Sequence, residues 1–129
     1  MQRTPIKKHL PKLKPLDDIF SECVRRLAME NMGGCEYCGT KKTDWKELQC
    51  SHYVGRRNRH VRWTFNNCAG LCGGCHMYLD ANPYIHTEWM KKRIGSDNLD
   101  QLVRQSQMTN KVNLDTVKEN LTRYLEALI

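Results

Sequence analysis

Two cysteine pairs with the same spacing constrain this chain more than any other feature. Cys35-Glu-Tyr-Cys38 and Cys72-Gly-Gly-Cys75 each place two residues between the thiols. That gap lets both sulfurs of a pair bind one tetrahedral zinc ion, and two such pairs complete a closed four-cysteine site. We therefore predict a structural Zn²⁺ bound by Cys35, Cys38, Cys72 and Cys75.

The other cysteines favour metal binding over a disulfide scaffold. The chain has 129 residues and seven cysteines, an odd number. The first residues are basic, and no apolar signal-peptide segment follows them. Paired Cys-x-x-Cys motifs in such a chain indicate metal ligands. Cys23, Cys50 and Cys68 are then expected to be small buried apolar residues.

The charge balance indicates a polyanionic partner. Lys and Arg number 21 against 14 Asp and Glu, a net charge of +7. Such an excess attracts nucleic acid or an anionic membrane surface. No apolar run approaches the ~20 residues of a membrane span. We therefore expect nucleic acid as the partner and no membrane association.

We expect an arm and one domain. Residues 1–15 contain three of the four prolines and several lysines. They are expected to form a basic extended arm, which either becomes ordered on DNA or is a solvated tail without a role. Residues 16–129 form the single domain. A helix is predicted from Asp17 or Asp18 to about Asn31, before a pair of glycines.

The rest of the chain predicts an α+β fold. Residues 48–53 and 61–65 are expected to pair as an antiparallel ribbon around a turn at Gly55, followed by a helix at 72–81. This core covers about 33–81, and the tail, 82–129, is predicted to be helical, with helices at 83–94, 97–107 and 113–129. The apolar stripe of the last helix is expected to be core, with a homodimer face as the alternative.

Two polar residues between the cysteine pairs and one directly after the last cysteine suggest phosphodiester hydrolysis. That reaction needs a base to activate water and a cation to stabilise charge on the phosphate. His52, at the end of the first predicted strand, is the candidate base, because a neutral imidazole can accept a proton near pH 7. Asn67 is placed to bridge the loop, and His76 to bind a divalent metal. His9, His60 and His86 lie outside this motif and are expected at the surface.

The run from Asn67 to His76, Asn-Cys-Ala-Gly-Leu-Cys-Gly-Gly-Cys-His, resembles the Asn-to-Cys-x-x-Cys-His stretch of zinc-containing HNH endonucleases. The segment Leu48–Tyr53 is similar to the strand that carries their general base. The chain looks most like the phage NinG/Rap recombination nucleases, over roughly residues 12–105.

The resemblance implies a ββα-metal (His-Me finger) fold and metal-dependent DNA cleavage that leaves 5′-phosphate and 3′-hydroxyl ends. It implies that His52 is the catalytic general base, that Asn67 orients it, and that His76 binds the catalytic metal. It also implies a phage or prophage role in recombination, with branched DNA as one candidate substrate, and a place in the bacterial host cytoplasm. Branched DNA would call for two active sites, and so for a homodimer.

One position departs from the HNH pattern. Many HNH enzymes place Asp or His before the base as a second metal ligand, whereas this chain has Ser51, a poor ligand for a hard cation. Asp80 lies four residues after His76 and would share its helical face. Asp80 is either a substitute ligand or an ordinary solvated carboxylate. A weakly held cation favours Mg²⁺ or Mn²⁺ as the catalytic metal.

Four arginines, Arg56, Arg57, Arg59 and Arg62, lie close to the proposed base. Guanidinium groups suit phosphate oxygens, so we expect these residues to contact the DNA backbone; a merely solvated face is the alternative. Trp63 is expected to be core. The competing function is a non-catalytic, zinc-stabilised nucleic-acid-binding module, for which the serine at position 51 is the main support.

Overall fold

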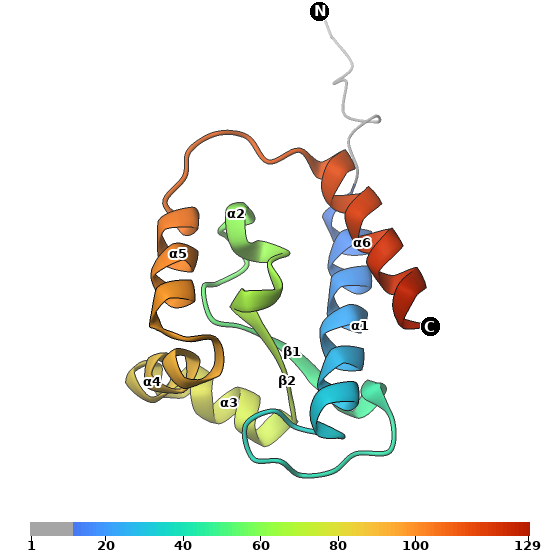
Figure 1. Cartoon of the computed structure of the whole chain (residues 1–129), viewed down its shortest axis with the longest axis vertical. Coiled ribbons are helices and arrows are strands. Elements are labelled where there is room, and N and C mark those ends of the chain that lie inside the picture. Colours follow the sequence, from blue (N-terminus) through green and yellow to red (C-terminus); the bar gives the residue numbers. More distant parts are fainter. Residues whose placement is uncertain (1–11) are drawn as a thin grey trace, which may run out of the picture.

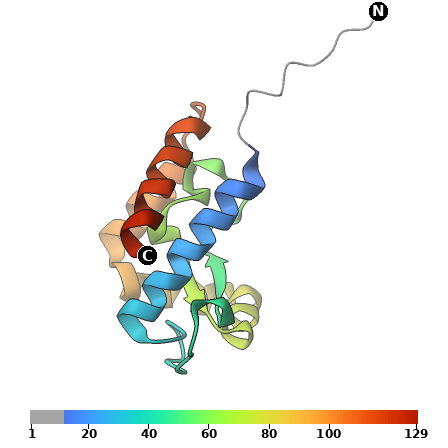
Figure 2. The same cartoon turned by 90° about the vertical axis from the view of Figure 1, so that its right-hand side faces the viewer.

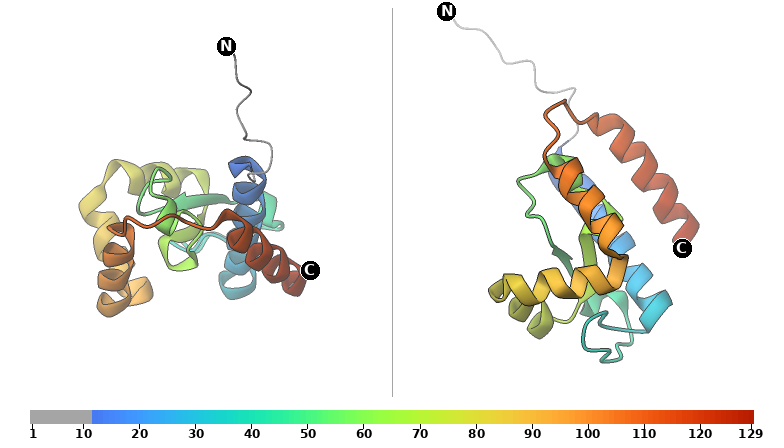
Figure 3. Two further views of the ribbon diagram at one scale, coloured as in Figure 1. Left: turned by 90° about the horizontal axis from the view of Figure 1, so that it is seen from above. Right: turned by 60° about the vertical axis from the view of Figure 1, so that its left-hand side comes forward.

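A small two-stranded sheet lies between two groups of helices in the computed structural model, which describes residues 12–129 (Figure 1). The fold is therefore mixed, but mostly helical. Helices α1 (Leu13–Met32) and α6 (Leu114–Leu128) lie on one side of the sheet. Helices α3 (Gly73–Ala81), α4 (Pro83–Ile94) and α5 (Ser96–Ser106) lie on the other (Figure 3, left). The strands are β1 (Gln49–His52) and β2 (Cys68–Leu71).

Helix α1 begins earlier than predicted. Its first residue is Leu13 and its N-cap is Lys12, so residues 13–15 of the expected arm are helical, and the predicted start at Asp17 or Asp18 is wrong. Pro15 is compatible with this start because the first turn of a helix needs no backbone donor at that position. The fully buried Leu16 holds the first turn against the core. The rest of the predicted arm, residues 1–11, lies outside the described residues.

The buried face of α1 organises the first part of the core. Leu16, Phe20 and Val24 recur at four-residue intervals, which places them on one side of the helix, and they pack with Trp63 and Leu121. Leu121 belongs to α6, which lies alongside α1 (Figure 2). Of the apolar stripe of the last helix, Leu121 is buried, and Leu114 and Val117 are partly buried against the same cluster. The core interpretation is thus confirmed for this part of the stripe, whereas Leu125 and Leu128 are only partly buried. Trp63 is also core, as expected.

The β1–β2 ribbon packs closely against α1. The strands are antiparallel, and their register pairs Cys50 with Gly70 and His52 with Cys68. A Cβ atom on Gly70 would lie 2.6 Å from the Cβ of Ala28 on α1. A side chain at position 70 would therefore push the helix and the ribbon apart, and glycine is what allows their contact.

The second strand is not where the sequence predicted it. Residues 61–65 do not form a strand; α2 (Arg59–Arg62) and the 3₁₀ turn η2 (Phe65–Asn67) occupy this region. The side chain of Asn58 caps α2 by accepting from the backbone N–H of His60 at 3.1 Å. The true partner strand, Cys68–Leu71, contains small residues that carry little strand propensity, and its pairing depends on the contact with α1.

The helical tail matches its prediction closely. A proline begins α4 and Gly95 follows its last residue, as the Asn82-Pro83 and Gly95 signals indicated. Asn113 caps α6 by accepting from the N–H of Thr116 at 3.1 Å. Within residues 12–129, none of the helices combines the length and the apolar character needed to cross a bilayer.

Candidate functional site

The four predicted zinc ligands converge on one point. Cys35 and Cys38 come from the loop after α1, Cys72 is the N-cap of α3, and Cys75 lies in its first turn. All four thiols are free, and their sulfurs lie within 4.8 Å of one another. The Cys38 and Cys72 sulfurs are 3.9 Å apart. Four thiolates around one zinc at about 2.3 Å would stand about 3.8 Å from each other, so this group fits a tetrahedral zinc ion.

Local backbone geometry explains why the first pair converges. Gly39 adopts a left-handed conformation with φ of 76°. Its N–H donates to the carbonyl of Cys35 at 3.0 Å, and the N–H of Cys35 donates to the carbonyl of Thr40 at 3.0 Å. These bonds fold the loop back on itself, so both thiols point the same way.

The protonation of this group favours a bound cation. The pKa of Cys38 is lowered to about 6, chiefly by its contacts with Thr40, whereas burial raises the pKa of Cys75. Thiolates so close together repel one another, so they cannot all ionise without a nearby positive charge. The donor set therefore suits a soft or borderline dication such as zinc.

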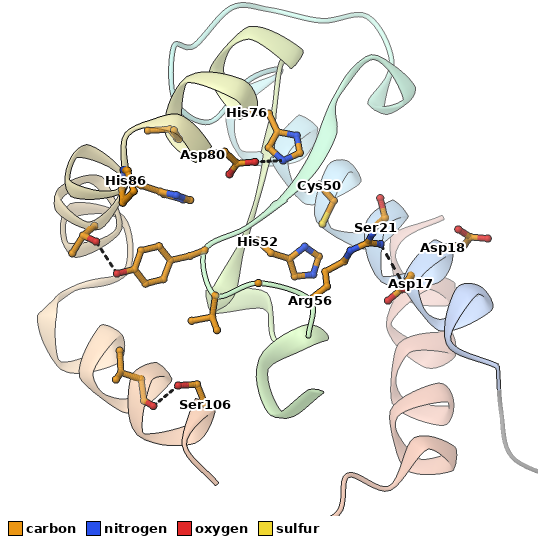
Figure 4. A pocket seen from close by; sticks show the side chains of 17 residues that line it. Asp17, Asp18, Ser21, Cys50, His52, Arg56, His76, Asp80, His86 and Ser106 are labelled. Atoms are coloured by element: carbon orange, nitrogen blue, oxygen red, sulfur yellow. Dashed lines mark hydrogen bonds and ion pairs between the residues drawn. The ribbon is translucent and has the colours of Figure 1, made fainter. Parts of the chain in front are cut away.

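The second feature is a polar cleft of about 1020 Å³ between the two groups of helices (Figure 4). Its walls come from α1, β1, the loop after β1, α3, α4 and α5. Two residues predicted to be functional, His52 and His76, both line it, as does Asp80. The fold thus brings the proposed base and the proposed metal ligand to one cavity, although they belong to different elements.

His52 is held in a defined tautomer. Its Nε2 lies 2.9 Å from the carbonyl oxygen of Arg62, which can only accept, so Nε2 carries the proton. Nδ1 is then the nitrogen with the free lone pair. Burial lowers the pKa of His52, only partly offset by the bond to the Arg62 carbonyl. The ring is therefore neutral near pH 7 and can accept a proton at Nδ1.

Asn67 binds the segment between β1 and β2, which includes the Arg62 carbonyl that accepts from His52. Its side chain is fully buried. Its Oδ1 accepts from the N–H of Val54 at 2.7 Å, and its Nδ2 donates to the carbonyls of Val54 at 2.9 Å and Val61 at 3.1 Å. The loop bridging expected of Asn67 is present. Any effect of Asn67 on His52 runs through the backbone next to Arg62, because its side-chain bonds go to the loop.

His76 presents its Nε2 beside a carboxylate. Its Nδ1 lies 2.8 Å from Oε1 of Gln49, an acceptor, so Nδ1 carries the proton. Nε2 then holds the lone pair, 3.4 Å from Oδ2 of Asp80. An imidazole oriented by a second hydrogen bond, next to a carboxylate four residues on, is a common arrangement for a metal ligand. Asp80 therefore lies beside His76, as a substitute ligand must, but its side chain is 55% exposed. Its role as a metal ligand stays a prediction.

Ser51 cannot supply the ligand that its position suggests. It alternates with Cys50 and His52 along β1, so it faces the opposite side of the strand. Its side chain is 1% exposed, and Oγ makes no hydrogen bond. Position 51 therefore departs from the HNH pattern in two ways: the residue is a serine, and its side chain lies on the face of β1 opposite to His52.

Sequence reasoning missed His86 as a member of this cleft. It was expected at the surface, but it is 5% exposed and lines the cavity, so that expectation is wrong. Burial lowers its pKa, and the charge of Asp80 acts in the opposite direction. His86 and Met90 lie one turn apart on the buried side of α4. That four-residue spacing was the available signal. His60 is partly exposed, and His9 lies outside the described residues.

Asp17 of α1 was also missed, and it ties the helix to the loop that holds His52. Its carboxylate accepts from Arg62 Nε at 3.0 Å, from Arg62 Nη2 at 2.6 Å and from Trp63 Nε1 at 2.9 Å. Burial acts to raise the pKa of Asp17, but the bonds and charge of Arg62 outweigh it and lower the pKa. These bonds fix both residues that flank the carbonyl accepting from His52.

The four arginines divide into two environments. Arg56 and Arg57 are exposed in the loop after β1, and Arg59 is exposed on α2. Arg56 also lines the cleft. The side chain of Arg62 is only 14% exposed and is paired with Asp17. Contact with DNA stays a prediction for this group, and the geometry gives Arg62 a structural task as well.

These features define a small, mostly helical α+β protein in which a cluster of four cysteines that could hold a metal ion adjoins a histidine-lined cleft. The family model described as the bacteriophage lambda NinG protein matches residues 1–128. The chain therefore belongs to the phage lambda NinG family. Comparison with curated proteins and with solved structures gave no match.

Proposed function

We propose that this protein is a metal-dependent DNA endonuclease of the HNH class, in which β1, β2 and α3 form the ββα-metal core. The observation that carries the proposal is the state of His52: a partly buried, neutral imidazole whose Nε2 is bound to a carbonyl and whose Nδ1 lone pair remains free. That is the form a general base needs.

The main steps of phosphodiester hydrolysis can be given to named residues. Nδ1 of His52 takes a proton from a water molecule, whose oxygen forms a bond to phosphorus. The bond from phosphorus to the 3′ oxygen breaks, and this oxygen takes a proton from a solvent water molecule, leaving a 3′-hydroxyl and a 5′-phosphate. Asn67 and Asp17 keep the loop that positions His52 rigid, through bonds to Val54, Val61 and Arg62.

His76 and Asp80 are the residues that would hold a divalent cation. One imidazole nitrogen and one carboxylate, with water completing the shell, suit Mg²⁺ or Mn²⁺. When bound, such a cation supplies positive charge for the phosphate and the departing oxygen. The exposed Arg56, Arg57 and Arg59 would contact the DNA backbone, in keeping with the net charge of +7.

Membership of the NinG family supports a phage role in recombination or DNA processing, with branched DNA as a candidate substrate and a homodimer as the form that would cut two strands. A structural zinc bound by the four cysteines would fix Cys72 and Cys75, and with them the start of α3 and the position of His76.

A non-catalytic, zinc-stabilised nucleic-acid-binding module is the second candidate. It is favoured by the small ligand set of the proposed catalytic cation, since Ser51 is buried on the wrong face and Asp80 is 55% exposed. Under this alternative the protein binds DNA through the same basic surface and does not cut it.

Plasmid nicking with Mg²⁺ or Mn²⁺ separates these functions. We expect the His52→Ala variant to lose about 10²–10⁴-fold in rate, the usual contribution of a general base. His60→Ala is the matched control, because His60 also bonds a backbone carbonyl, that of Asn110, but lies outside the cleft. Equal nicking by the wild type and His52→Ala would remove His52 as the base.

A substrate panel and a metal-binding assay complete the test. Linear duplex, single-stranded and four-way-junction DNA should identify the substrate that is cut. DNA binding without cleavage of any substrate would favour the non-catalytic module. Mn²⁺ binding should weaken in His76→Ala while the zinc content stays unchanged.

A further inference from the structure

A second group of metal-binding side chains lies on the face of the ribbon that α1 covers. Ligand atoms of Cys50, His52 and Cys68 all lie within 4.8 Å of one another. The arrangement follows from the register, since Cys50 and His52 alternate on one face of β1 and Cys68 pairs with His52. Gly70 lies opposite Cys50 and carries no side chain, so the ligand atoms on this part of the ribbon are those of Cys50, His52 and Cys68.

This group is separate from the four-cysteine site. It shares no residue with Cys35, Cys38, Cys72 and Cys75, and it comes from two strands rather than from two Cys-x-x-Cys motifs. Two thiols and one imidazole form a soft donor set, typical of zinc and of other thiophilic cations and unlike the oxygen-rich sets that bind Mg²⁺. Three protein ligands with an open fourth position differ from the closed four-ligand sets of structural zinc sites.

The open side of this group faces the cleft. Cys50 and His52 line the cavity, whereas Cys68 is 1% exposed and forms the inner end of the group. In Figure 4 the sulfur of Cys50 and the ring of His52 lie on the same side of β1, near Ser21 and Arg56. A cation would therefore enter from the cleft. Tetrahedral zinc needs its ligand atoms about 3.5–3.8 Å apart, and these atoms lie within 4.8 Å of one another, so binding requires the side chains to close by about 1 Å at most.

We propose that Cys50, His52 and Cys68 form a second, exchangeable site for Zn²⁺ and similar thiophilic cations, and that filling this site switches the protein off. Inhibition rests on the proposed function, because a cation bound to His52 would prevent that ring from accepting a proton. The metal site itself does not depend on that function. The same ribbon would thus carry the base and the means of blocking it.

Cobalt binding to the zinc-loaded protein tests the site directly, under reducing conditions. Zinc binds such ligands more tightly than cobalt, so the four-cysteine site should keep its zinc. We expect about one equivalent of Co²⁺ to bind with a thiolate-to-metal charge-transfer band, and added Zn²⁺ to abolish that band. Cys50→Ala, which changes a partly exposed residue, should lose the band. Cys23→Ala, which changes a buried cysteine outside both groups, should keep it.

The nuclease assay tests the consequence, with each variant compared to its own activity without added zinc. In Cys50→Ala the zinc concentration for half-inhibition should rise by more than about tenfold, because loss of even an outer-shell partner costs about 10–100-fold in metal affinity. Cys23→Ala should keep the wild-type value.

Three results are decisive. Absence of the thiolate band in the wild type, or an equal band in Cys50→Ala, would overturn the site. Equal zinc inhibition of the wild type and Cys50→Ala would overturn the switch. A thiolate band that depends on Cys50, in a protein that cuts no DNA at any zinc level, would establish the site and refute the proposed function.

Discussion

The four-cysteine site and the cleft differ in how their residues are distributed along the chain. The first is made of two short motifs, each of which positions its own two thiols through local backbone geometry. The second takes residues from Asp17 to Ser106 and from five helices and strands. The first site can therefore be recognised from spacing alone, whereas the second exists only once the helices have packed around the ribbon.

The largest effect should come from loss of the structural metal. Cys38 is exposed, so replacing it by Ala would ordinarily change the free energy of unfolding by less than about 0.5 kcal/mol. As a zinc ligand it should instead cost more than about 3 kcal/mol, a fraction of the ~10–16 kcal/mol with which structural zinc binds small domains. Denaturant unfolding measures this change in the free energy of unfolding, and the zinc content of each variant shows whether the metal has been lost.

The buried Cys23→Ala is the control for that experiment, with an expected loss of about 1 kcal/mol, similar to the loss of one buried methyl group. A smaller loss in the free energy of unfolding for Cys38→Ala than for Cys23→Ala would contradict the assignment of Cys38 as a zinc ligand.

The next effect concerns the loop that supports the cleft. Asn67→Ala would leave the N–H and the carbonyl of Val54 without a partner. The carbonyl of Val61 would lose one bond but would still accept from the N–H of Thr64 at 3.2 Å. We expect a loss of about 2–4 kcal/mol in the free energy of unfolding, since each unsatisfied buried group costs about 1–3 kcal/mol. The neighbouring Asn66 is exposed, so Asn66→Ala should be nearly neutral. Equal losses for the two variants would show that the bridge is unimportant.

The pH dependence of cleavage should report His52. Burial lowers the pKa of His52 below the ordinary 6.5. The ring therefore stays neutral as the pH falls through 6.5, and cleavage activity is lost only when the pH falls below the lowered pKa. Asp17 acts to raise the pKa of His52, so Asp17→Asn should move this acidic limb to still lower pH and also reduce the maximal rate.

Asp18→Asn provides the comparison for the pH experiment, because Asp18 is exposed and pairs with Lys14 instead of Arg62. Rate profiles measured across pH 5–8 decide the matter, provided that zinc content is constant over the range. A shift of the acidic limb towards higher pH in Asp17→Asn would contradict this account of His52.

The smallest effect should be on DNA affinity. Replacing the exposed Arg57 by Ala should weaken binding a few-fold for all sequences and reduce the salt slope by about 1, as for the loss of one phosphate contact. Arg123→Ala removes another exposed arginine, on α6, and should change neither quantity. A salt titration of binding to a short duplex measures both. Identical slopes for the two variants would move the DNA surface away from the arginine loop.

The predictions from the sequence succeeded where short-range geometry decides the outcome. The positions of α3 and α4 followed from Cys72, Asn82-Pro83 and Gly95, whose effects act within one helical turn. The convergence of the four cysteines followed from their spacing in the same way. Of the three cysteines outside the paired motifs, Cys23 and Cys68 are buried as expected, whereas Cys50 is partly exposed and lines the cleft, so the expectation is wrong for Cys50.

The failures share a different cause. The second strand was placed at residues 61–65 because these side chains favour strands, but Asn58 caps a helix there, and Val61 and Trp63 are used in the core. The true strand contains Ala69 and Gly70, which carry no strand signal. It forms because Gly70 allows α1 to approach. Propensity describes isolated segments, so it cannot include such a contact.

By itself, the sequence determined the cysteine frame, most of the helices and three of the residues on which the proposal rests, His52, Asn67 and His76. The tertiary structure decided what surrounds them: Asp17 and His86 on the cleft, the carbonyl that fixes the tautomer of His52, and the meeting of Cys50 with Cys68. The reason is the range of the forces involved. Metal spacing and helix caps act over a few residues, whereas a cleft depends on the packing of elements far apart in the chain.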